Sequence, residues 1–473
     1  GLTVLPADRI SRVEGWGMAV GADGYLVQPT DAGQVIDALR SASSSNAPVV
    51  ARGAGCSYGD AALLPEALVL DFSRMRRILS WDPVTGIVDV EPGVTVRQLW
   101  RQSLPDGWWP PVVTGTMEPT VGGGLAMNVH GKNNWARGTL GDHCLELDLL
   151  TPDGGQRVIS RDAEPDVFHA VIGGFGQLGL ITRARIQMKK VHSGFIEATA
   201  VASPDLGDLL LKIDDAKDQW EYVVGWLDAF PGGSKLGRGL LHFARHLEPD
   251  EDPEPRAGLE PTRQDLPANL FGVVPKSLMW RMMKPFTNNL GMRAVNLAKY
   301  VQGSTIGNNA VYRQTLAAFS FLLDYVPDWK KAYLPGGLIQ HQSFVPAADA
   351  ERVFRTQLEI CRRRGMPSYL AVLKRHRPDS FLLTHAVDGF SMALDFPVVA
   401  SRRAELWALV RELAEPVVEA GGRFYPAKDA ALPGELYRAT FRDGQLDRFR
   451  DLKKRLDPDG MLRSALAERL LGG

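Results

Sequence analysis

The sequence predicts an α+β protein made of two or three structural units. Short strand patterns alternate with short helical patterns over residues 1–190, and a second series of strands and helices follows residue 323. Between the two series lie an acidic, proline-rich stretch at 247–265 and a segment at 266–323 that contains no Asp or Glu. At about 150 residues per domain, a chain of 473 residues holds two or three units.

Local patterns assign the elements in chain order. In the first series, a helix is expected at 30–45, with Thr30 as its N-cap, and strands are expected at 47–53, 66–73, 86–96, 144–154 and 180–191. The stretch 247–265 has the composition of a mobile surface loop. In the second series, strands are expected at 338–345, 369–376 and 390–399, and helices at 349–365 and 404–422.

Composition narrows the class of protein. The formal net charge is −1, which gives no reason to expect a nucleic-acid partner. The three cysteines, Cys56, Cys144 and Cys361, cannot all pair, and their spacing fits no zinc site, so we expect no metal and a reducing compartment. The first residues lack the pattern of a signal peptide, and no apolar run is long enough to span a membrane. These features predict a cytoplasmic protein.

Residues 173–179, GGFGQLG, contain the spacing G-x-G-x-x-G. In a Rossmann fold a strand precedes these glycines and a helix follows them, so that the helix N-terminus holds a pyrophosphate. Here the order is reversed, because 164–173 reads as a helix and 180–191 as a strand. The glycines are therefore expected to bring the backbone close to a flat or phosphorylated group in another way.

Two further glycine-rich stretches support this interpretation. Residues 51–60, ARGAGCSYGD, follow a strand, and successive N–H groups in such a loop can hold a diphosphate. Residues 114–133, TGTMEPTVGGGLAMNVHGKN, add five glycines and two threonine hydroxyls. A single glycine cluster is as readily a tight turn or a packing site. Three such clusters, each beside a strand pattern, favour a binding site for a dinucleotide.

Five motifs together resemble the flavin oxidoreductases of the vanillyl-alcohol oxidase type. They are R-G-x-G-x-S-Y-G-D at 52–60, G-T-x-x-x-T-V-G-G at 115–123, H-G-K-N at 130–133, G-G-x-G-x-x-G at 173–179 and Y-x-A-K-D at 425–429. Within that group the chain is most similar to the flavoprotein subunits of polyprenyl-phosphate pentose epimerases. The resemblance covers nearly the whole chain and is most specific in its first 190 and last 50 residues.

The resemblance implies a two-subdomain FAD-binding fold with an inserted antiparallel-sheet substrate domain. Residues 1–194 and 423–473 would form the FAD-binding domain, and residues 195–422 the substrate domain. The loop at 53–58 would hold the pyrophosphate, and later glycines would approach the flavin, ribityl and adenine groups. The implied FAD-binding residues are Arg52, Gly53, Ala54, Gly55, Cys56, Ser57, Tyr58, Gly115, Thr116, Thr120, Gly122, Gly123, Ala126, Met127, His130, Gly131, Lys132, Gly176, Gly179, Ile181, Tyr425, Ala427 and Lys428.

The resemblance also bears on how FAD is attached. Many members of the group bind it covalently through a histidine in the first glycine loop or a cysteine in the second. Tyr58 and Glu118 stand at those positions here, and neither makes the usual link. We therefore expect non-covalent FAD. Cys56, two residues from Tyr58, is expected to be a buried thiol rather than an attachment point.

The candidate catalytic residues follow from the needs of alcohol oxidation. A cation must stand near the flavin as it gains negative charge, and a group must take the hydroxyl proton. Lys428 is the first candidate for the cation and Lys374 the second. The basic neighbours Arg375 and Arg377 also fit an alternative in which Lys374 is a solvent-exposed residue of a strand. Gln340 and Gln342 share one face of a strand. His130 completes the catalytic set, and the implied substrate-binding residues are Lys132, Trp226, Gln340, Gln342, Lys374 and Asp395.

The implied activity is oxidation of a secondary sugar hydroxyl to a ketone. The substrate would be the 2′-OH of a polyprenyl-phosphate pentose, as the first half of an epimerisation in cell-wall biosynthesis that a separate short-chain dehydrogenase/reductase completes. Two alternatives stay open: oxidation of a soluble sugar, alditol, aldonolactone or cyclitol, and ligand binding without turnover. Ala393 stands where the resembled subunits have a cysteine, which leaves the exact substrate open.

The acid-free segment 266–323 carries several basic and large apolar residues. A segment of this kind would suit contact with a membrane surface or a lipid-linked phosphosugar. It would equally suit a helical lid or a dimer contact. The expected location is therefore cytoplasmic or peripheral at the inner face of a membrane.

Overall fold

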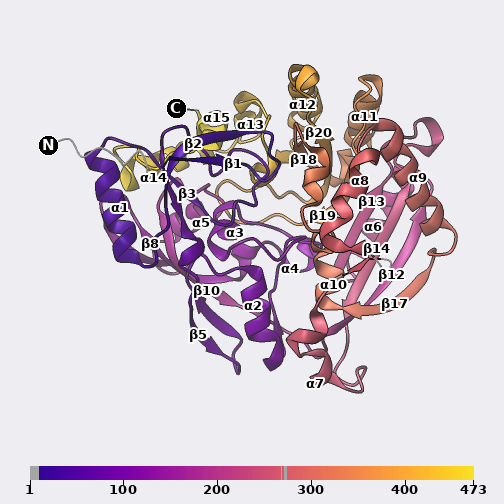
Figure 1. Ribbon diagram of the computed structural model, residues 1–473, viewed down its shortest axis with the longest axis horizontal. Coiled ribbons are helices and arrows are strands. Elements are labelled where there is room, and N and C mark those ends of the chain that lie inside the picture. Colours follow the sequence, from indigo (N-terminus) through magenta and orange to yellow (C-terminus); the bar gives the residue numbers. More distant parts are fainter. Residues whose placement is uncertain (1–9, 268, 271–273, 473) are drawn as a thin grey trace.

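The computed structural model describes residues 10–267, 269–270 and 274–472. Figure 1 shows two lobes side by side. The first lobe combines the start of the chain with its last helices, and the second holds a large sheet formed by the middle of the chain. This arrangement is an α+β fold, as the sequence predicts. The division into domains at residues 194 and 422 stays a prediction. The strand β21 (Arg423–Phe424) lies just beyond the second boundary and still pairs with the large sheet.

The first lobe contains two sheets. The four-stranded sheet has the order β1-β2-β4-β3, in which β4 runs parallel to both of its neighbours. The five-stranded sheet has the order β5-β6-β10-β8-β9 and is antiparallel throughout. Their strands are β1 (Ile10–Glu14), β2 (Gly21–Val27), β3 (Val49–Arg52), β4 (Leu68–Asp71), β5 (Ile78–Asp82), β6 (Ile87–Val90), β8 (Cys144–Leu150), β9 (Gln156–Ser160) and β10 (Leu180–Gln187).

The helices that the sequence predicts at 30–45 and 164–173 are present in this lobe, but one cap differs. The helix α1 (Ala32–Ser44) begins one residue later than a Thr30 cap would allow, because the side chain of Asp31 accepts the hydrogen bond from Gln34 N. The prediction of Thr30 as N-cap was therefore wrong. The remaining helices are α2 (Val96–Ser103), α3 (Val121–Met127), α4 (Asn134–Arg137), α5 (Pro165–Val171), α13 (Gly434–Ala439), α14 (Gln445–Leu456) and α15 (Ala465–Leu471).

The order of elements around residues 173–179 is confirmed. The helix α5 precedes these glycines and the strand β10 follows them, which is the reverse of a Rossmann unit. Gly176 has φ +71°, a conformation that side chains rarely adopt, and a Cβ there would have only Ala51 Cβ nearby, at 3.7 Å. The turn therefore leaves open space in front of Gly176, toward the loop that follows β3.

The large sheet has eight strands in the order β17-β12-β14-β13-β19-β20-β18-β21, and every neighbouring pair is antiparallel. Three helices cover one face: α6 (Leu206–Ala216), α11 (Ala350–Arg363) and α12 (Arg403–Glu419). The helix α9 (Asn289–Ser304) packs over β12 and β14 on the opposite face. The main strands are β12 (Phe195–Ser203), β13 (Tyr222–Leu227), β14 (Gly239–His246), β17 (Ala310–Thr315), β18 (Leu338–Pro346), β19 (Leu370–His376) and β20 (Gly389–Pro397).

The two segments of unusual composition lie at the edge of the large sheet. The acidic stretch 247–265 contains α7 (Pro255–Gly258) and a short 3-10 turn at Pro261–Gln264. The acid-free segment 266–323 contains α8 (Met279–Met283), α9, the edge strand β17 and α10 (Leu316–Ser320). Its part at 268 and 271–273 lies outside the described residues. The acid-free segment thus supplies both an edge of the sheet and a helical cover over it.

Candidate active site

A large cleft in the first lobe brings the three glycine stretches together. It contains about 1440 Å³ of space that protein atoms do not fill, part of it open to solvent, and no Asp or Glu among the described residues lines it. The charged groups on its wall are Arg52 and Lys428. Such a lining of backbone, small side chains and two cations suits a long ligand that carries a diphosphate.

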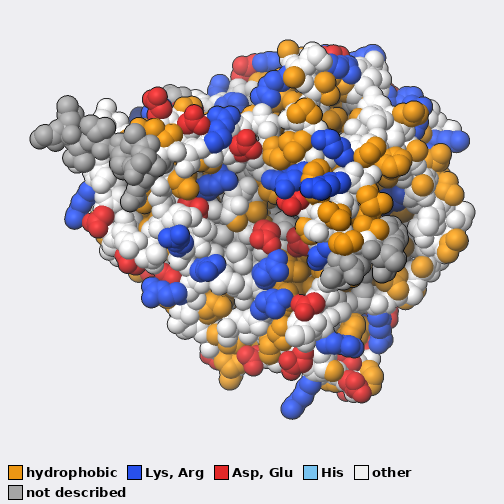
Figure 2. All heavy atoms as spheres, viewed as in Figure 1, with side chains coloured by type: hydrophobic (Ala, Val, Ile, Leu, Met, Phe, Trp, Pro, Cys, Tyr) orange, Lys and Arg blue, Asp and Glu red, His pale blue; other side chains and the backbone are white. Residues whose placement is uncertain are grey.

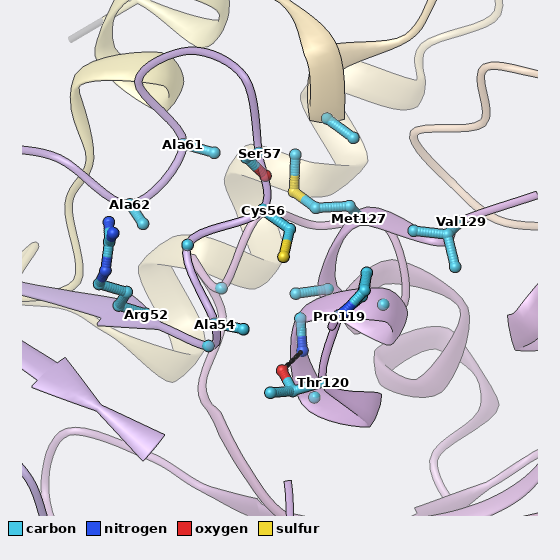
Figure 3. Close-up of a pocket in the computed structure, with 18 of the residues that line it drawn as sticks. Arg52, Ala54, Cys56, Ser57, Ala61, Ala62, Pro119, Thr120, Met127 and Val129 are labelled. Atoms are coloured by element: carbon cyan, nitrogen blue, oxygen red, sulfur yellow. Dashed lines mark hydrogen bonds between the residues drawn. The ribbon is translucent and has the colours of Figure 1, made fainter. Parts of the chain in front are cut away.

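The first wall of the cleft is the loop that follows β3, shown in Figure 3. A Cβ on Gly53 would lie 2.3 Å from Thr120 Oγ1, so the backbone here passes directly over the start of α3. Thr120 Oγ1 in turn accepts a hydrogen bond of 3.1 Å from Gly123 N and caps α3 (Figure 3). The missing side chain at Gly53 is therefore a requirement of the contact between the two loops.

The second wall is the loop at 114–120, and hydrogen bonds to Asp324, a residue that the sequence did not indicate, hold it in place. Asp324 accepts hydrogen bonds from Thr116 Oγ1 at 2.6 Å and from Met117 N at 2.8 Å, and Leu323 N donates to Gly115 O at 3.1 Å. Leu323 also lines the cleft. The segment after α10 thus closes over the loop at 114–120. Asp324 lies more than 200 positions from Thr116 and Met117 in the sequence, so no local sequence pattern could have predicted these contacts.

Most of the predicted FAD-binding residues lie on this cleft. Those that line it are Arg52, Gly53, Ala54, Gly55, Cys56, Ser57, Tyr58, Gly115, Thr116, Thr120, Gly122, Gly123, Ala126, Met127, Gly176, Gly179, Ile181, Tyr425, Ala427 and Lys428. His130, Gly131 and Lys132 are absent from the lining. His130 instead packs behind it, with its ring 4.6 Å from that of Tyr425.

Cys56 and Tyr58 stand on the cleft wall in different surroundings. Burial raises the pKa of the Cys56 thiol to about 12, and the nearby Glu118 charge adds to the rise. A thiol with so high a pKa holds little thiolate near neutral pH and is a poor nucleophile. The ring of Tyr58 is buried, and Lys428 Nζ lies 4.7 Å from its centroid. Lys428 is therefore held at the cleft by a cation–π contact.

Five of the six predicted substrate-binding side chains share one face of the large sheet, and the sixth, Lys132, comes from outside its strands. In the register, Gln340 pairs with Asp395 and Gln342 with Ala393, while Val372 pairs with both Ala393 and Trp226. Directly paired residues of antiparallel strands point to the same side, and so do residues two apart along a strand. Gln340, Gln342, Lys374, Asp395 and Trp226 therefore point to the side that α9 covers.

The charges on this face are shifted by their surroundings. Burial, together with the charges of Lys428 and Lys132, lowers the pKa of Lys374 to about 7. Burial also lowers the pKa of Lys428, but the nearby Asp395 carboxyl raises it. Burial raises the pKa of Asp395 to about 6 against the hydrogen bond of 2.6 Å from Gln340 Nε2. Near pH 7 the amine of Lys374 is thus partly neutral and can accept a proton.

A buried chain of hydrogen bonds fixes the imidazoles beside this face. Asn134 Oδ1 accepts from Arg377 N, so its contact of 2.9 Å with His376 Nδ1 makes that nitrogen a donor. His376 Nε2 is then an acceptor for the Ser391 hydroxyl at 2.6 Å. Ser391 Oγ in turn accepts from Gln342 Nε2 at 3.2 Å. Every hydrogen in this chain is therefore donated in one direction, from Gln342 through Ser391 and His376 to Asn134.

The hydrogen-bond partners of His130 also show which of its ring nitrogens carries the proton. Gln342 Nε2 lies 3.3 Å from His130 Nε2, and because an amide nitrogen only donates, His130 Nε2 accepts. His130 Nδ1 then carries the proton and donates to His385 Nε2 at 3.2 Å. Burial lowers the pKa of His385 to about 3, and it lowers the pKa values of His130 and His376 as well. All three rings are therefore neutral near pH 7.

The outcome for Gln342 is a defined orientation. Both of its amide hydrogens are used, one by Ser391 and one by His130. Its Oε1 is left as an acceptor without a partner in the part of the chain that the structure describes. Sequence reasoning missed Asn134, His376, His385 and Ser391. The signal available for His376 was its strand alternation with Lys374, which places both on one face.

The comparisons with known proteins agree with this geometry. Residues 24–160 match the family model described as FAD binding domain. The chain is 31% identical to decaprenylphosphoryl-beta-D-ribose oxidase of Mycolicibacterium smegmatis over 465 residues, which is 97% of each chain. The chain belongs to the same family of FAD-linked oxidoreductases. It is an FAD-dependent oxidoreductase, as the sequence motifs predict.

Two further relatives match a smaller share of this chain. The chain is 29% identical to an uncharacterized protein of Streptomyces coelicolor over 385 residues, which is 80% of this chain and all of that one. It is 30% identical to cytokinin dehydrogenase 2 of rice over 234 residues, which is 46% of this chain and 41% of that enzyme.

Proposed function

We propose that this FAD-linked oxidoreductase oxidises the 2′-hydroxyl of a polyprenyl-phosphate pentose to a ketone. The observation that carries the proposal is the sheet face beside the FAD cleft. On this face a partly neutral Lys374 lies beside Gln340, Gln342 and Asp395, whose side chains can form hydrogen bonds to a sugar. The substrate class follows from the name of the relative that matches nearly the whole chain.

FAD fits the cleft that the three glycine stretches form. The loop at 53–58 would hold the pyrophosphate, the positive φ of Gly55 and Gly176 keeps side chains out of the path, and Tyr425 and Lys428 would lie at the end nearest the sheet. When bound, FAD supplies the oxidant that takes a hydride from the sugar carbon. Burial of the Cys56 thiol and the absence of an attaching residue at Tyr58 support non-covalent binding.

The chain's own residues divide the remaining work. Lys374 accepts the proton of the reacting hydroxyl, because its amine is partly neutral near pH 7. Lys428, which Asp395 and the Tyr58 ring hold at the cleft, supplies positive charge where negative charge builds up. Gln342 Oε1 accepts a hydrogen bond from a neighbouring sugar hydroxyl and orients the ring.

The experiment that tests this function is anaerobic bleaching of the flavin absorbance. We expect a polyprenyl-phosphate ribose to bleach the purified protein within seconds, and free ribose, alditols and cyclitols to leave the spectrum unchanged. Bleaching by a free sugar alone would favour the soluble-substrate alternative. Precipitation with acid before the assay should release the yellow colour into the supernatant, and colour retained in the pellet would contradict non-covalent FAD.

Because the product is a ketone, the proposed epimerisation also needs a second enzyme. A short-chain dehydrogenase/reductase would return a hydride to the opposite face of the sugar carbon. The proposal predicts that the oxidase alone accumulates the ketone. Adding such a reductase with a nicotinamide cofactor should yield the epimeric sugar, detected by mass spectrometry and chromatography.

The surface formed by α8 and α9 supports contact with a membrane that carries such a substrate. Figure 2 shows hydrophobic side chains mixed with basic ones where Figure 1 places these helices. The exposed apolar residues there are Leu278, Met282, Met283, Phe286, Leu290, Val295, Leu297 and Val301. The basic residues beside them are Lys276, Arg281, Lys284 and Arg293. No helix among the described residues is both long and apolar enough to cross a bilayer.

Co-sedimentation with vesicles tests this contact. We expect binding to vesicles that contain anionic phospholipid, weaker binding to neutral vesicles and loss of binding in the triple variant K276E/R281E/K284E. Equal binding of the variant and the parent would contradict it. The flavin content of the variant serves as the control for folding.

A further inference from the structure

Three basic groups on the substrate side of the large sheet, two lysines and a histidine, lack a carboxylate partner among the described residues. Lys132 belongs to the H-G-K-N stretch, His242 to β14 and Lys299 to α9. Among the described residues, no Asp or Glu contributes to the electrostatic surroundings of any of the three. Charges at such depth are normally paired or used, because an unpaired one is costly to desolvate.

Contacts hold the two ammonium groups in place without neutralising their charge. Lys132 Nζ donates to Phe319 O at 2.7 Å and lies 4.6 Å from the Phe319 ring centroid. Lys299 Nζ lies 4.4 Å from the ring centroid of Trp226. His242 pairs with Val224, which in turn pairs with Lys374 on the next strand, so the side chains of His242 and Lys374 face the same side of the sheet.

The imidazole of His242 responds to both lysines. Burial, together with the charges of Lys299 and Lys132, lowers the pKa of His242 to about 4, so its ring is neutral near pH 7. Burial lowers the pKa values of Lys132 and Lys299 to about 8. An anion placed among them would raise all three pKa values and relieve the repulsion. The segment that carries Lys299 holds no Asp or Glu over 266–323, so it adds no opposing charge.

We infer that Lys132, His242 and Lys299 form a phosphate subsite, which holds the phosphodiester of the substrate between α9 and the large sheet. The inference rests on the proposed function, in which the sugar is linked to a lipid through phosphate. Trp226 and Phe319, which carry the two ammonium groups, form an apolar floor beside the subsite. The subsite sets the sugar at Lys374 and leads the lipid toward the exposed apolar residues of α8 and α9.

Calorimetric titration of the FAD-loaded protein with farnesyl phosphate and with farnesol tests the subsite. The parent protein should bind farnesyl phosphate at least about tenfold more tightly than farnesol, as expected for charge-assisted hydrogen bonds. The variant Lys299→Met should lose about tenfold in affinity for farnesyl phosphate and keep its affinity for farnesol. Lys299→Arg, which retains the charge, should keep most of the preference.

Lys454→Met is the control, because it removes an exposed lysine from α14, away from the large sheet. It should bind both ligands as the parent does. Equal affinities of the parent for the two ligands would overturn the inference, and so would equal losses in Lys299→Met and Lys454→Met. Binding is measured without turnover, so a protein that prefers farnesyl phosphate but oxidises no polyprenyl-phosphate pentose contradicts the proposed function and still supports the subsite.

Discussion

The FAD cleft and the substrate face of the large sheet are built in opposite ways. The cleft is formed by backbone and small side chains from three short glycine-rich stretches, and its charged groups are Arg52 and Lys428. The sheet face is formed by large polar side chains from five strands, several of them with pKa values far from their usual ranges.

The difference matches what each region would bind in the proposed function. A diphosphate and a flat ring need close approach of the backbone, and glycine allows this wherever a Cβ would intrude. A reacting sugar needs proton transfer and oriented hydrogen bonds, which require side chains in a low-dielectric setting. Substitutions should therefore separate the two regions: in the cleft they should affect FAD content, and on the sheet face they should affect turnover.

The largest effect is expected from Gly53→Ala. Its Cβ would lie 2.3 Å from Thr120 Oγ1 and displace the cap of α3. We expect affinity for FAD to fall by roughly 100-fold or more, equivalent to about 2.7 kcal/mol. The ratio of flavin absorbance to protein absorbance after purification measures it. Gly307→Ala is the control, since its Cβ would meet no atom closer than 3.4 Å, and normal FAD content in both variants would contradict the account of the cleft.

Lys428→Met tests a cation that belongs to both regions. It lines the cleft and responds to the charge of Asp395. We expect FAD to remain bound while the rate of anaerobic bleaching falls by about 10²–10³-fold, the loss seen when one stabilising donor is removed. Lys428→Arg should recover part of the rate. An unchanged rate in Lys428→Met would show that this charge does not act on the reaction.

Lys374→Met should remove a pH dependence. Because its pKa is about 7, the amine is protonated below that pH and available as a base above it. The bleaching rate of the parent should therefore rise as the pH increases through about 7 and then level off. The variant should be about 100-fold slower at pH 8 and lack this rise. A rise at pH 7 that survives the substitution would assign the base to another group.

The smallest effect is expected from Ser391→Ala, which interrupts the hydrogen-bond chain from Asn134 to Gln342. Freed from Ser391, Gln342 should hold the sugar less well, and KM should rise by about tenfold at nearly constant kcat. Ser343→Ala is a matched control: it is also fully buried on a neighbouring strand, but it bonds Gln357 on the opposite face. Equal changes in KM for the two variants would mean that the chain does not position Gln342.

Much of the cofactor region could be predicted because its signals are local. The spacing of glycines in 51–60, 114–133 and 173–179 and the order of α5 and β10 follow from adjacent residues. Even the exception at α1 is local, since Asp31 competes with its neighbour Thr30 for the same cap and has the geometry to reach Gln34 N. The strand periodicity likewise indicated that Gln340 and Gln342 share a face.

The rest depended on contacts between distant parts of the chain. Asp324 reaches Thr116 only because the segment after α10 folds back over the first lobe. Lys299 meets Trp226 only because α9 crosses β14 on the side opposite α6. The spacing of residues in the sequence does not predict how these segments cross, because the crossing depends on which faces bury apolar surface against each other.

By itself, the sequence determined the glycine loops, the order of their flanking elements, the family and the residue types available for oxidation. Only the tertiary structure decided which of these side chains act together. The register of β18, β19 and β20 places Lys374, Ser391 and Gln342 on one face. Burial lowers the pKa of Lys374, and His130 and His376 fix the hydrogen bonds of Gln342 and Ser391. The reason is physical: local conformation follows from neighbouring residues, whereas pKa values and hydrogen-bond direction follow from burial and from partners that only the folded chain brings together.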